Sequence, residues 1–167
     1  AWYNLVAAFI SQPAMTNLYQ GAGANPPLPG SKTIYACPAG AKPAFNPTLQ
    51  RAYFMYGMNG RICINKSTRN GPPRVSQTRL TNVRRPSDTV LVAEVDGNSG
   101  GVAQSNVTGQ YAVGRHERRG ELALCDGSAR MVKTNDFVRT AAESNGSAAE
   151  WAVDRVIYWY PTSTTPN

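Results

Sequence analysis

The sequence predicts a β-hairpin more strongly than any other element of this chain. Polar and apolar residues alternate over 121–125, and a second extended run at 129–133 follows Asp126 and Gly127. Asp-Gly between two such runs favours a tight turn, because glycine adopts positive φ angles without steric cost. His116, the single histidine of the chain, stands just before the first strand, and nine residues separate it from Asp126.

The composition is that of a loop-rich globular protein. The chain has 167 residues, of which 41% are hydrophobic and 16% are charged. This length suffices for one domain with a hydrophobic core, which we expect at 1–160, followed by a flexible tail at 161–167. The sequence has no apolar run of about 18 residues, the length that a membrane-spanning helix needs. Because Ala1 is not a natural start, we expect a processed chain or a fragment of a longer one.

The periodicity predicts a short helix followed by a sheet. Apolar residues at positions 2, 5, 6, 9 and 10 share one helical face, and Pro13 ends that helix or begins a second one. The run 89–95 is β-branched and apolar, as in a buried strand. We expect the α+β class, with roughly five or six antiparallel strands joined by long loops. The smaller expected elements are extended pieces at 33–37, 53–56 and 111–114, a turn at 57–60, a loop at 96–109 and a helix at 135–144.

Glu94 is the one charged residue of the predicted strand 89–95, so its carboxylate needs a partner there. Arg115 or His116 supplies one if the hairpin pairs beside this strand. We expect a structural network of Glu94, His116 and Asp126 that fixes the strand register and the turn at Gly127. The alternative is a divalent metal site. Carboxylate and turn oxygens suit calcium better than zinc, and Asp96 and Asp126 are its candidate ligands.

The three cysteines allow at most one disulfide within the chain. Cys37 and Cys63 are the candidate pair, and their bridge would be worth roughly 3 kcal/mol in an oxidising compartment. Cys125 belongs to the hairpin, and we expect it to be a small packed thiol rather than a reactive one. A zinc site is not expected, because the chain has no C-x-x-C pair and a single histidine.

Five segments resemble, in the same order, the prepilin-type, processing-associated H-x(9)-D-G proteins of the bacterial cell envelope. His116, Asp126 and Gly127 have the spacing of the family's closing motif. The other segments are AWYNLVAAFISQ at 1–12, IYACPA at 34–39, YGMNG at 56–60 and RLTNVRRPSDTVLVAE at 79–94. The resemblance runs from about Trp2 to Val132 and leaves the C-terminal part uncovered.

The resemblance implies a pilin-like fold, in which a long N-terminal helix packs on an antiparallel sheet, with most of that helix missing here. It implies a structural subunit of an envelope filament, similar to a type IV pilin or a type II secretion pseudopilin. Such a subunit is anchored in the inner membrane through its helix, faces the periplasm or the exterior, and assembles with copies of itself or other pilin-like subunits. No catalysis is expected, and no cofactor other than the calcium of the alternative, which some pseudopilins hold near the C-terminus.

Two other functions compete with this one. The net charge of +7 suits a secreted module that binds polysaccharide or nucleic acid through a basic, aromatic surface. Nucleic acid is not expected, because no helix-turn-helix, zinc finger or aromatic-rich RNA motif accompanies the basic residues. A small hydrolase would use His116, but the chain has no G-x-S-x-G motif. The aromatic residues available to a binding module are Tyr53, Tyr56, Trp151, Tyr158, Trp159 and Tyr160.

Overall fold

The computed structural model describes residues 2–19, 33–40, 55–62, 78–95 and 106–165. The chain forms two compact units, and each is described by itself. The first unit comprises Ala1–Tyr56 and Asp96–Ser105, and the second comprises Gly57–Val95 and Asn106–Asn167. The single domain predicted for 1–160 thus contains a division that the sequence does not signal.

Two short helices open the first unit, α1 at Trp2–Phe9 and α2 at Met15–Tyr19. The amide of Gln12 donates to the carbonyl of Ala7 at 3.1 Å, and Ser11 has a φ of 53°. A residue with positive φ at this point is a common way to end a helix, because it turns the chain back onto the last free carbonyls. The helix thus ends at Phe9, ahead of Pro13, and α2 begins after that proline, at Met15.

The apolar face of α1 is turned outward. Leu5 is 69% exposed and Phe9 is 90% exposed, whereas Ala7, on another side of the helix, is 2% exposed. An amphipathic helix ordinarily buries its large apolar side chains and exposes its small or polar ones. In α1 the face with the small side chain of Ala7 is buried, and the face with the large apolar side chains is exposed to solvent.

Residues 33–40 form turns, so the extended piece predicted at 33–37 is wrong. The hydroxyl of Thr33 accepts a hydrogen bond from the amide of Tyr35 at 3.1 Å, and the carbonyl of Thr33 accepts one from the amide of Ala36 at 3.2 Å. A threonine side chain that satisfies nearby backbone in this way favours a turn over a strand. The turn places Ala36 and Cys37 in a small buried cluster with Met55.

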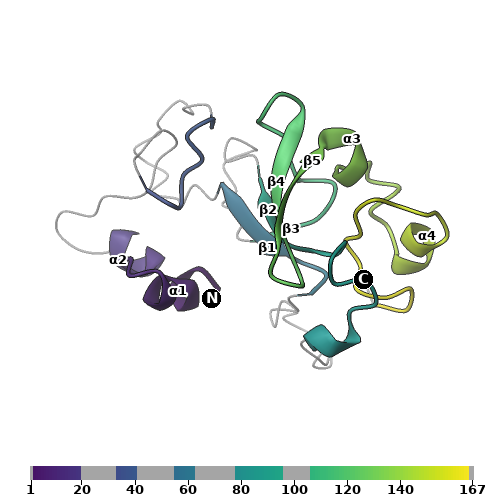
Figure 1. The fold of residues 1–167 in the computed structure, drawn as a ribbon, viewed down its shortest axis with the longest axis horizontal. Helices are drawn as coiled ribbons and strands as arrows, with labels where there is room; N and C mark the ends of the chain where they lie inside the picture. The colour runs from purple at the N-terminus through teal and green to yellow at the C-terminus, as the bar shows by residue number, and fades with distance from the viewer. Residues whose placement is uncertain (1, 20–32, 41–54, 63–77, 96–105, 166–167) are drawn as a thin grey trace, which may run out of the picture. The chain divides into compact units, whose positions relative to one another are not determined.

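A five-stranded sheet has the order β3–β1–β2–β4–β5 (Figure 1). Its central strand β2 lies within the predicted run 89–95, and β4 and β5 are the predicted hairpin. The mixed α and β character expected from the sequence is confirmed, whereas the pilin-like arrangement of helix and sheet stays a proposal. The strand bounds are β1 Tyr56–Asn59, β2 Val90–Glu94, β3 Asn106–Val107, β4 Arg119–Leu124 and β5 Ala129–Lys133.

The strand pairing is mixed. β4 pairs antiparallel with β2 and with β5, as predicted. β1 and β3 pair in parallel, with Met58 opposite Asn106, so the expectation of a wholly antiparallel sheet is wrong at this edge. The short strand β3 lies inside the loop predicted at 96–109, and the strand expected at 111–114 is reduced to one bridge between Ala112 and Val95.

The turn that the Asn-Gly pair predicts at 57–60 lies two residues later, at 59–62, where the amide of Ile62 donates to the carbonyl of Asn59 at 3.1 Å, and residues 56–59 form β1. The side-chain amide of Asn59 is fully buried and donates to the carbonyls of Val90 and Trp159, at 2.8 and 2.7 Å. A Cβ on Gly57 would lie 3.0 Å from atoms of Val107. Contacts with distant parts of the chain therefore hold residues 56–59 extended up to this turn.

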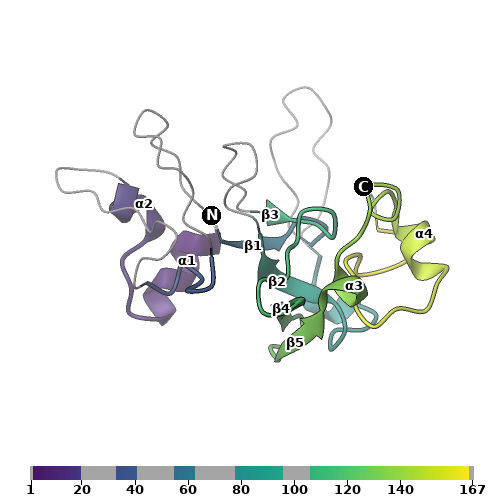
Figure 2. The same ribbon diagram turned by 90° about the horizontal axis from the view of Figure 1, so that it is seen from above.

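The C-terminal part completes the core of the second unit. Both ribbon views place α3, at Thr134–Phe137, beside β5, and α4, at Ser147–Trp151, farther from the sheet (Figure 1, Figure 2). Residues 157–160 are all at most 2% exposed, and Tyr158 bridges in parallel to Thr89. The segment that the family resemblance leaves uncovered thus supplies the largest buried side chains.

The helix predicted at 135–144 ends after one turn. Val138 is extended, with φ −74° and ψ 140°, and the amide of Arg139 donates to the carbonyl of Gly109 at 2.8 Å. The chain leaves the helix there because Arg139 is drawn into the core, where it is 5% exposed. Farther on, the hydroxyl of Ser147 hydrogen-bonds the carbonyls of Ser163 and Thr165. These bonds hold the last described residues of the chain against the start of α4.

Candidate functional site

The buried carboxylate of Glu94 is the centre of the predicted network. Glu94 ends β2 and is 1% exposed. Its Oε1 atom lies 3.3 Å from Nε2 of His116 and 3.6 Å from Nη1 of Arg115. Its Oε2 atom accepts a hydrogen bond from the amide of Glu121 at 3.3 Å. Both partners named from the sequence therefore meet Glu94, and we call these three residues, Glu94, Arg115 and His116, the clasp.

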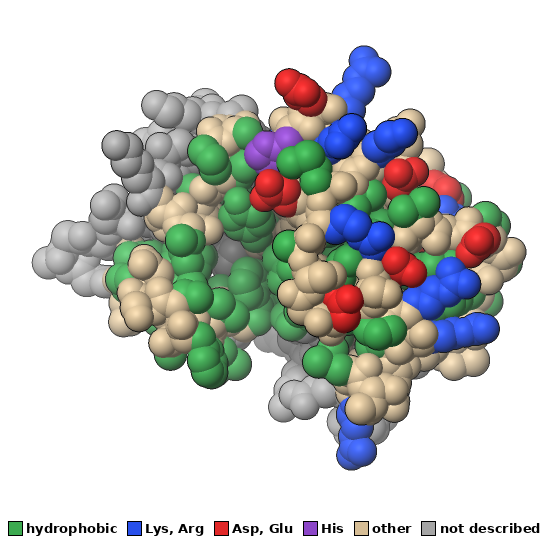
Figure 3. Space-filling model, viewed as in Figure 1, with side chains coloured by type: hydrophobic (Ala, Val, Ile, Leu, Met, Phe, Trp, Pro, Cys, Tyr) green, Lys and Arg blue, Asp and Glu red, His purple; other side chains and the backbone are tan. Residues whose placement is uncertain are grey.

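A strained turn positions the clasp histidine. His116 and Arg119 exchange two backbone hydrogen bonds, of 3.0 and 2.9 Å, around the two residues between them. Glu117 and Arg118 have φ angles of 51° and 63°. Positive φ at both central residues is the mark of a type I′ turn, which suits a right-twisted hairpin but ordinarily contains Asn or Gly. The turn holds His116 directly ahead of β4, with its side chain 27% exposed. Figure 3 shows this single histidine at the surface, close to several Lys and Arg side chains.

Arg115 also binds the end of β2. Its guanidinium donates to the carbonyl of Val95, and its side chain is 12% exposed. Nη1 of Arg115 is buried and makes no hydrogen bond within the described ranges, so the Coulomb attraction of Glu94 is what offsets its burial. The arrangement joins the end of β2 to the residues that lead into β4. Chemically, it is a buried ion-pair lock between two neighbouring strands.

Asp126 and Gly127 lie at the other end of β4 and do not join Glu94. The Oδ1 atom of Asp126 accepts hydrogen bonds from the amide and the hydroxyl of Ser128, at 2.9 and 2.7 Å. These bonds from Ser128 hold the pKa of Asp126 below its ordinary value. Gly127 has a φ of 87°, as the predicted tight turn requires. The two residues therefore shape the hairpin turn, and the three-residue network with His116 is replaced by separate contacts at the two ends of one strand.

The calcium alternative depends on Asp96, which lies outside the described residues. Asp126, its other candidate ligand, already directs one carboxylate oxygen into its own turn. The pair therefore stays a sequence-based hypothesis.

The candidate disulfide likewise involves an undescribed residue, Cys63, while Cys37 is 1% exposed. Cys125 is 6% exposed, and its burial, helped by the charge of Asp126, raises the pKa of its thiol to about 11. A thiol with such a pKa carries little thiolate near neutral pH, which is the form that reacts. Cys125 is thus the packed thiol that the sequence predicts.

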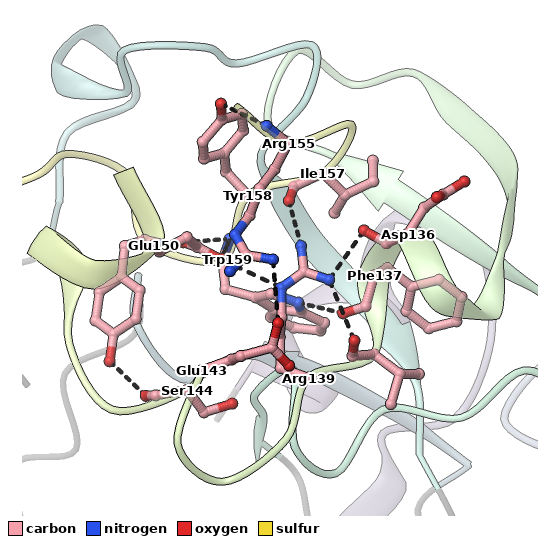
Figure 4. Close-up of polar contacts among 12 residues, drawn as sticks. Asp136, Phe137, Arg139, Glu143, Ser144, Glu150, Arg155, Ile157, Tyr158 and Trp159 are labelled. Atoms are coloured by element: carbon pink, nitrogen blue, oxygen red, sulfur yellow. Dashed lines mark hydrogen bonds and ion pairs between the residues drawn. The ribbon is translucent and has the colours of Figure 1, made fainter. Parts of the chain in front are cut away.

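A second buried network, around Glu150, escapes the sequence analysis (Figure 4). Glu150 is 1% exposed, and its carboxylate accepts hydrogen bonds from the amides of Trp159 and Tyr160, the shortest at 2.7 Å. Burial raises the pKa of Glu150 above its ordinary value, and the two amide donors oppose that effect. The carboxylate is the acceptor that allows the buried segment 157–160 to lie in the core without forming a regular strand.

Arg139 is the second charged residue of this buried network. Its guanidinium donates to the carbonyls of Asp136, Val138 and Ile157, and its Nε atom lies 3.9 Å from Oε1 of Glu150 (Figure 4). Burial lowers the pKa of Arg139. The guanidinium thus hydrogen-bonds three backbone carbonyls that lie outside the named strands. A single Glu in the sequence AAEW gives no local sign of this role, because its partners lie nine and ten residues farther along the chain.

Three of the six aromatic residues proposed for a binding surface belong to this core. Tyr158, Trp159 and Tyr160 are each at most 2% exposed. The Nε1 atom of Trp159 donates to the carbonyl of Phe137 at 2.7 Å, and the hydroxyl of Tyr160 donates to the backbone carbonyl of Ser144 at 2.8 Å. Their rings and polar atoms are already engaged inside the protein, so they are unavailable to an external ligand.

In comparisons with known proteins, no family model, no curated protein and no solved structure matches this chain. Among the helices of the described ranges, none has the length and apolar character needed to cross a membrane.

Proposed function

We propose that this chain is the head region of a pilin-like or pseudopilin-like subunit, which assembles into a filament of the bacterial cell envelope. One observation carries the proposal. Two of the segments that resemble the H-x(9)-D-G proteins, 79–94 and 116–127, contact each other at both ends of β4. His116 meets Glu94 at one end of β4, and at the other end the amide of Asp126 donates to the carbonyl of Pro86 at 3.2 Å.

A third resembling segment joins the same assembly. Asn59, from the segment 56–60, donates to the carbonyl of Val90 in β2. Segments that occur in a fixed order along a family's sequences are expected to form one packed unit if they define its fold. In this chain three of them contact one another through specific hydrogen bonds and an ion pair, which supports reading the resemblance as one of structure and not of isolated short motifs.

The clasp acts as a scaffold in this proposal and not as a catalyst. Glu94 is buried beneath Arg115 and His116, and its second carboxylate oxygen receives the amide of Glu121. A carboxylate surrounded in this way holds strands together, whereas a general base needs an open path to a substrate proton. The family resemblance assigns the same structural part to the hairpin.

The open apolar face of α1 is the surface through which the subunit would contact its neighbours. Leu5 and Phe9, together with Val6 and Ile10 at 42% and 40% exposure, form a continuous apolar stripe. Removing apolar surface from water contributes about 25 cal/mol per Å², which gives such a stripe a strong tendency to associate. In a pilin-like filament the partners are the corresponding helices of this chain or of other pilin-like subunits.

The experiment is a fractionation of the source bacterium. Surface filaments are sheared from cells, and the chain is detected with an antibody in the filament, membrane and soluble fractions. The proposal predicts the chain in the filament or membrane fraction, and a larger unprocessed form in cells that lack the prepilin peptidase. A chain that stays in the soluble fraction, with the same size in both strains, would overturn it.

A further inference from the structure

A cleft lies beside the type I′ turn, within the second unit. Its volume is about 610 Å³, and its lining includes the side chains of Arg118, Arg119, Lys133, Thr134, Asn135 and Glu117. Three of these six residues are cationic and one is anionic, so the cleft carries a net positive charge. Within the described part of the chain, no carboxylate lies within ion-pair distance of Arg118, Arg119 or Lys133.

The strand register forces two of these cations together. Arg119 and Lys133 are direct partners in the antiparallel pairing of β4 with β5. Side chains at directly opposed positions lie on the same face of the sheet, and like charges there repel each other. An opposed Glu would relieve this repulsion, yet the positions carry Arg and Lys. An anion bound between the two strands would also relieve the repulsion between Arg119 and Lys133.

The backbone adds a second unfavourable feature at the same place. Arg118 has a φ of 63°, in the left-handed region that a long side chain adopts rarely, and Glu117 beside it has a φ of 51°. Residues held in such conformations are concentrated at ligand clamps and switch regions, where the strain serves the site. Here the strained turn carries Arg118 to the cleft beside Arg119.

Thr134, one of the lining residues, carries an unsatisfied hydroxyl. The Oγ1 atom of Thr134 is buried and makes no hydrogen bond within the described ranges. A Cβ on Gly114, which also lines the cleft, would lie 2.2 Å from this oxygen, so the glycine leaves room for it. A buried hydroxyl with no partner costs free energy unless a ligand or water completes it.

We propose that this cleft binds a carboxylate-bearing sugar unit of an acidic polysaccharide. The cations would hold the sugar carboxylate, and the hydroxyl of Thr134, the amide of Asn135 and the carboxylate of Glu117 would pair with sugar hydroxyls. The cleft has no aromatic side chain in its lining, so it offers nothing on which a nucleobase stacks. Glu117 in the lining also disfavours a densely charged phosphate backbone. The site is separate from the proposed filament contact, so either can hold without the other.

The test is a calorimetric titration of the chain with a hexamer of galacturonic acid at low salt. The fully methyl-esterified hexamer, an oligothymidylate and vesicles of phosphatidylglycerol serve as competing probes. Arg118→Asn and Lys133→Gln each remove one cation, and each should weaken hexamer binding by about tenfold, the scale of one charge-assisted hydrogen bond. Because Asn accepts positive φ readily, Arg118→Asn should also raise the urea midpoint of unfolding, which separates lost binding from lost folding.

Arg130→Gln is the matched control. Arg130 lies on β5, is 40% exposed and pairs with Asp88, outside the cleft lining. Its removal changes the net charge by the same amount and should leave hexamer binding unchanged. Three results would overturn the proposal: no binding of the acidic hexamer, equal weakening by Arg130→Gln, or tighter binding of the oligothymidylate or the vesicles with the same dependence on Arg118 and Lys133.

Discussion

Oε1 of Glu94 lies 3.3 Å from Nε2 of His116, and this contact joins β2 to the residue that leads into β4. Glu94 is almost completely buried, so removing its charge leaves Arg115 in a poorly solvated position without a counter-ion. The hairpin and the central strand depend on each other through this one carboxylate.

Glu94→Gln should lower the free energy of unfolding by about 3 kcal/mol, because removing one partner of a buried ion pair leaves the other charge buried without a counter-ion. His116→Gln should cost about 1 kcal/mol, the scale of a single hydrogen bond. Urea denaturation followed by circular dichroism measures both. Asp154→Asn is the control, because Asp154 is 89% exposed in its pair with Arg85 and exposed pairs contribute little. Equal losses for Glu94→Gln and Asp154→Asn would show that the clasp contributes no stability.

The pH dependence of stability should reveal the burial of Glu150. Burial raises the pKa of Glu150 above its ordinary value of 4.5, so the folded state keeps this proton to a higher pH than the unfolded chain. The contribution of Glu150 to stability is therefore greatest at acid pH and falls as the pH rises through 4.5 towards the folded-state pKa. The stability of the wild type relative to Glu150→Gln should accordingly decrease between about pH 3 and pH 7.

Glu143 provides the opposite case. Hydrogen bonds from the amide and the hydroxyl of Thr140 hold the pKa of Glu143 below its ordinary value. Its contribution is present above the ordinary pKa and is lost as the pH falls through the lowered one. The stability of the wild type relative to Glu143→Gln should therefore increase over the same pH range. Slopes of the same sign for the two variants would contradict the assignment.

Gly120→Ala should destabilise the second unit by about 2 kcal/mol, the scale of an overpacked core. A Cβ at this position would lie 2.5 Å from Cζ of Phe137, whose ring is completely buried and has no room to withdraw. Gly60→Ala is the matched control, because the nearest atom to its Cβ would be the carbonyl oxygen of Val107 at 3.6 Å. Thermal unfolding of the two variants compares them directly. A Gly120→Ala variant as stable as Gly60→Ala would show that the ring of Phe137 does not pack against Gly120.

The sequence predicts those parts of the fold that local chemistry determines. Asp126-Gly127 defines a turn by itself, and the apolar run before Glu94 defines a buried strand, so the hairpin, β2 and the Glu94–His116 contact are all recoverable. The segment 56–60 is different. Its Asn-Gly pair predicts the turn that follows at 59–62, but not the strand β1 before it, whose buried Asn59 amide binds Val90 and Trp159, 31 and 100 residues away. No local pattern contains that information.

The same limit explains the missed network and the outward face of α1. Glu150 stands in a sequence typical of an ordinary helix, and its role comes from backbone amides that have no side-chain signature. The periodicity of α1 correctly identifies a helix with one apolar face. Periodicity does not say whether that face is covered by the same chain or is left for a partner.

The most direct test of the proposed filament role is photocross-linking from α1 in living cells. A benzophenone amino acid is placed at Phe9, which is 90% exposed on the apolar stripe, or at Ala8, which is exposed beside it. The proposal predicts that Phe9 forms a cross-link to a second copy of this chain or to another pilin-like subunit, and that Ala8 does so far less. Equal yields at the two positions, or no cross-linked subunit at Phe9, would contradict assembly through this face.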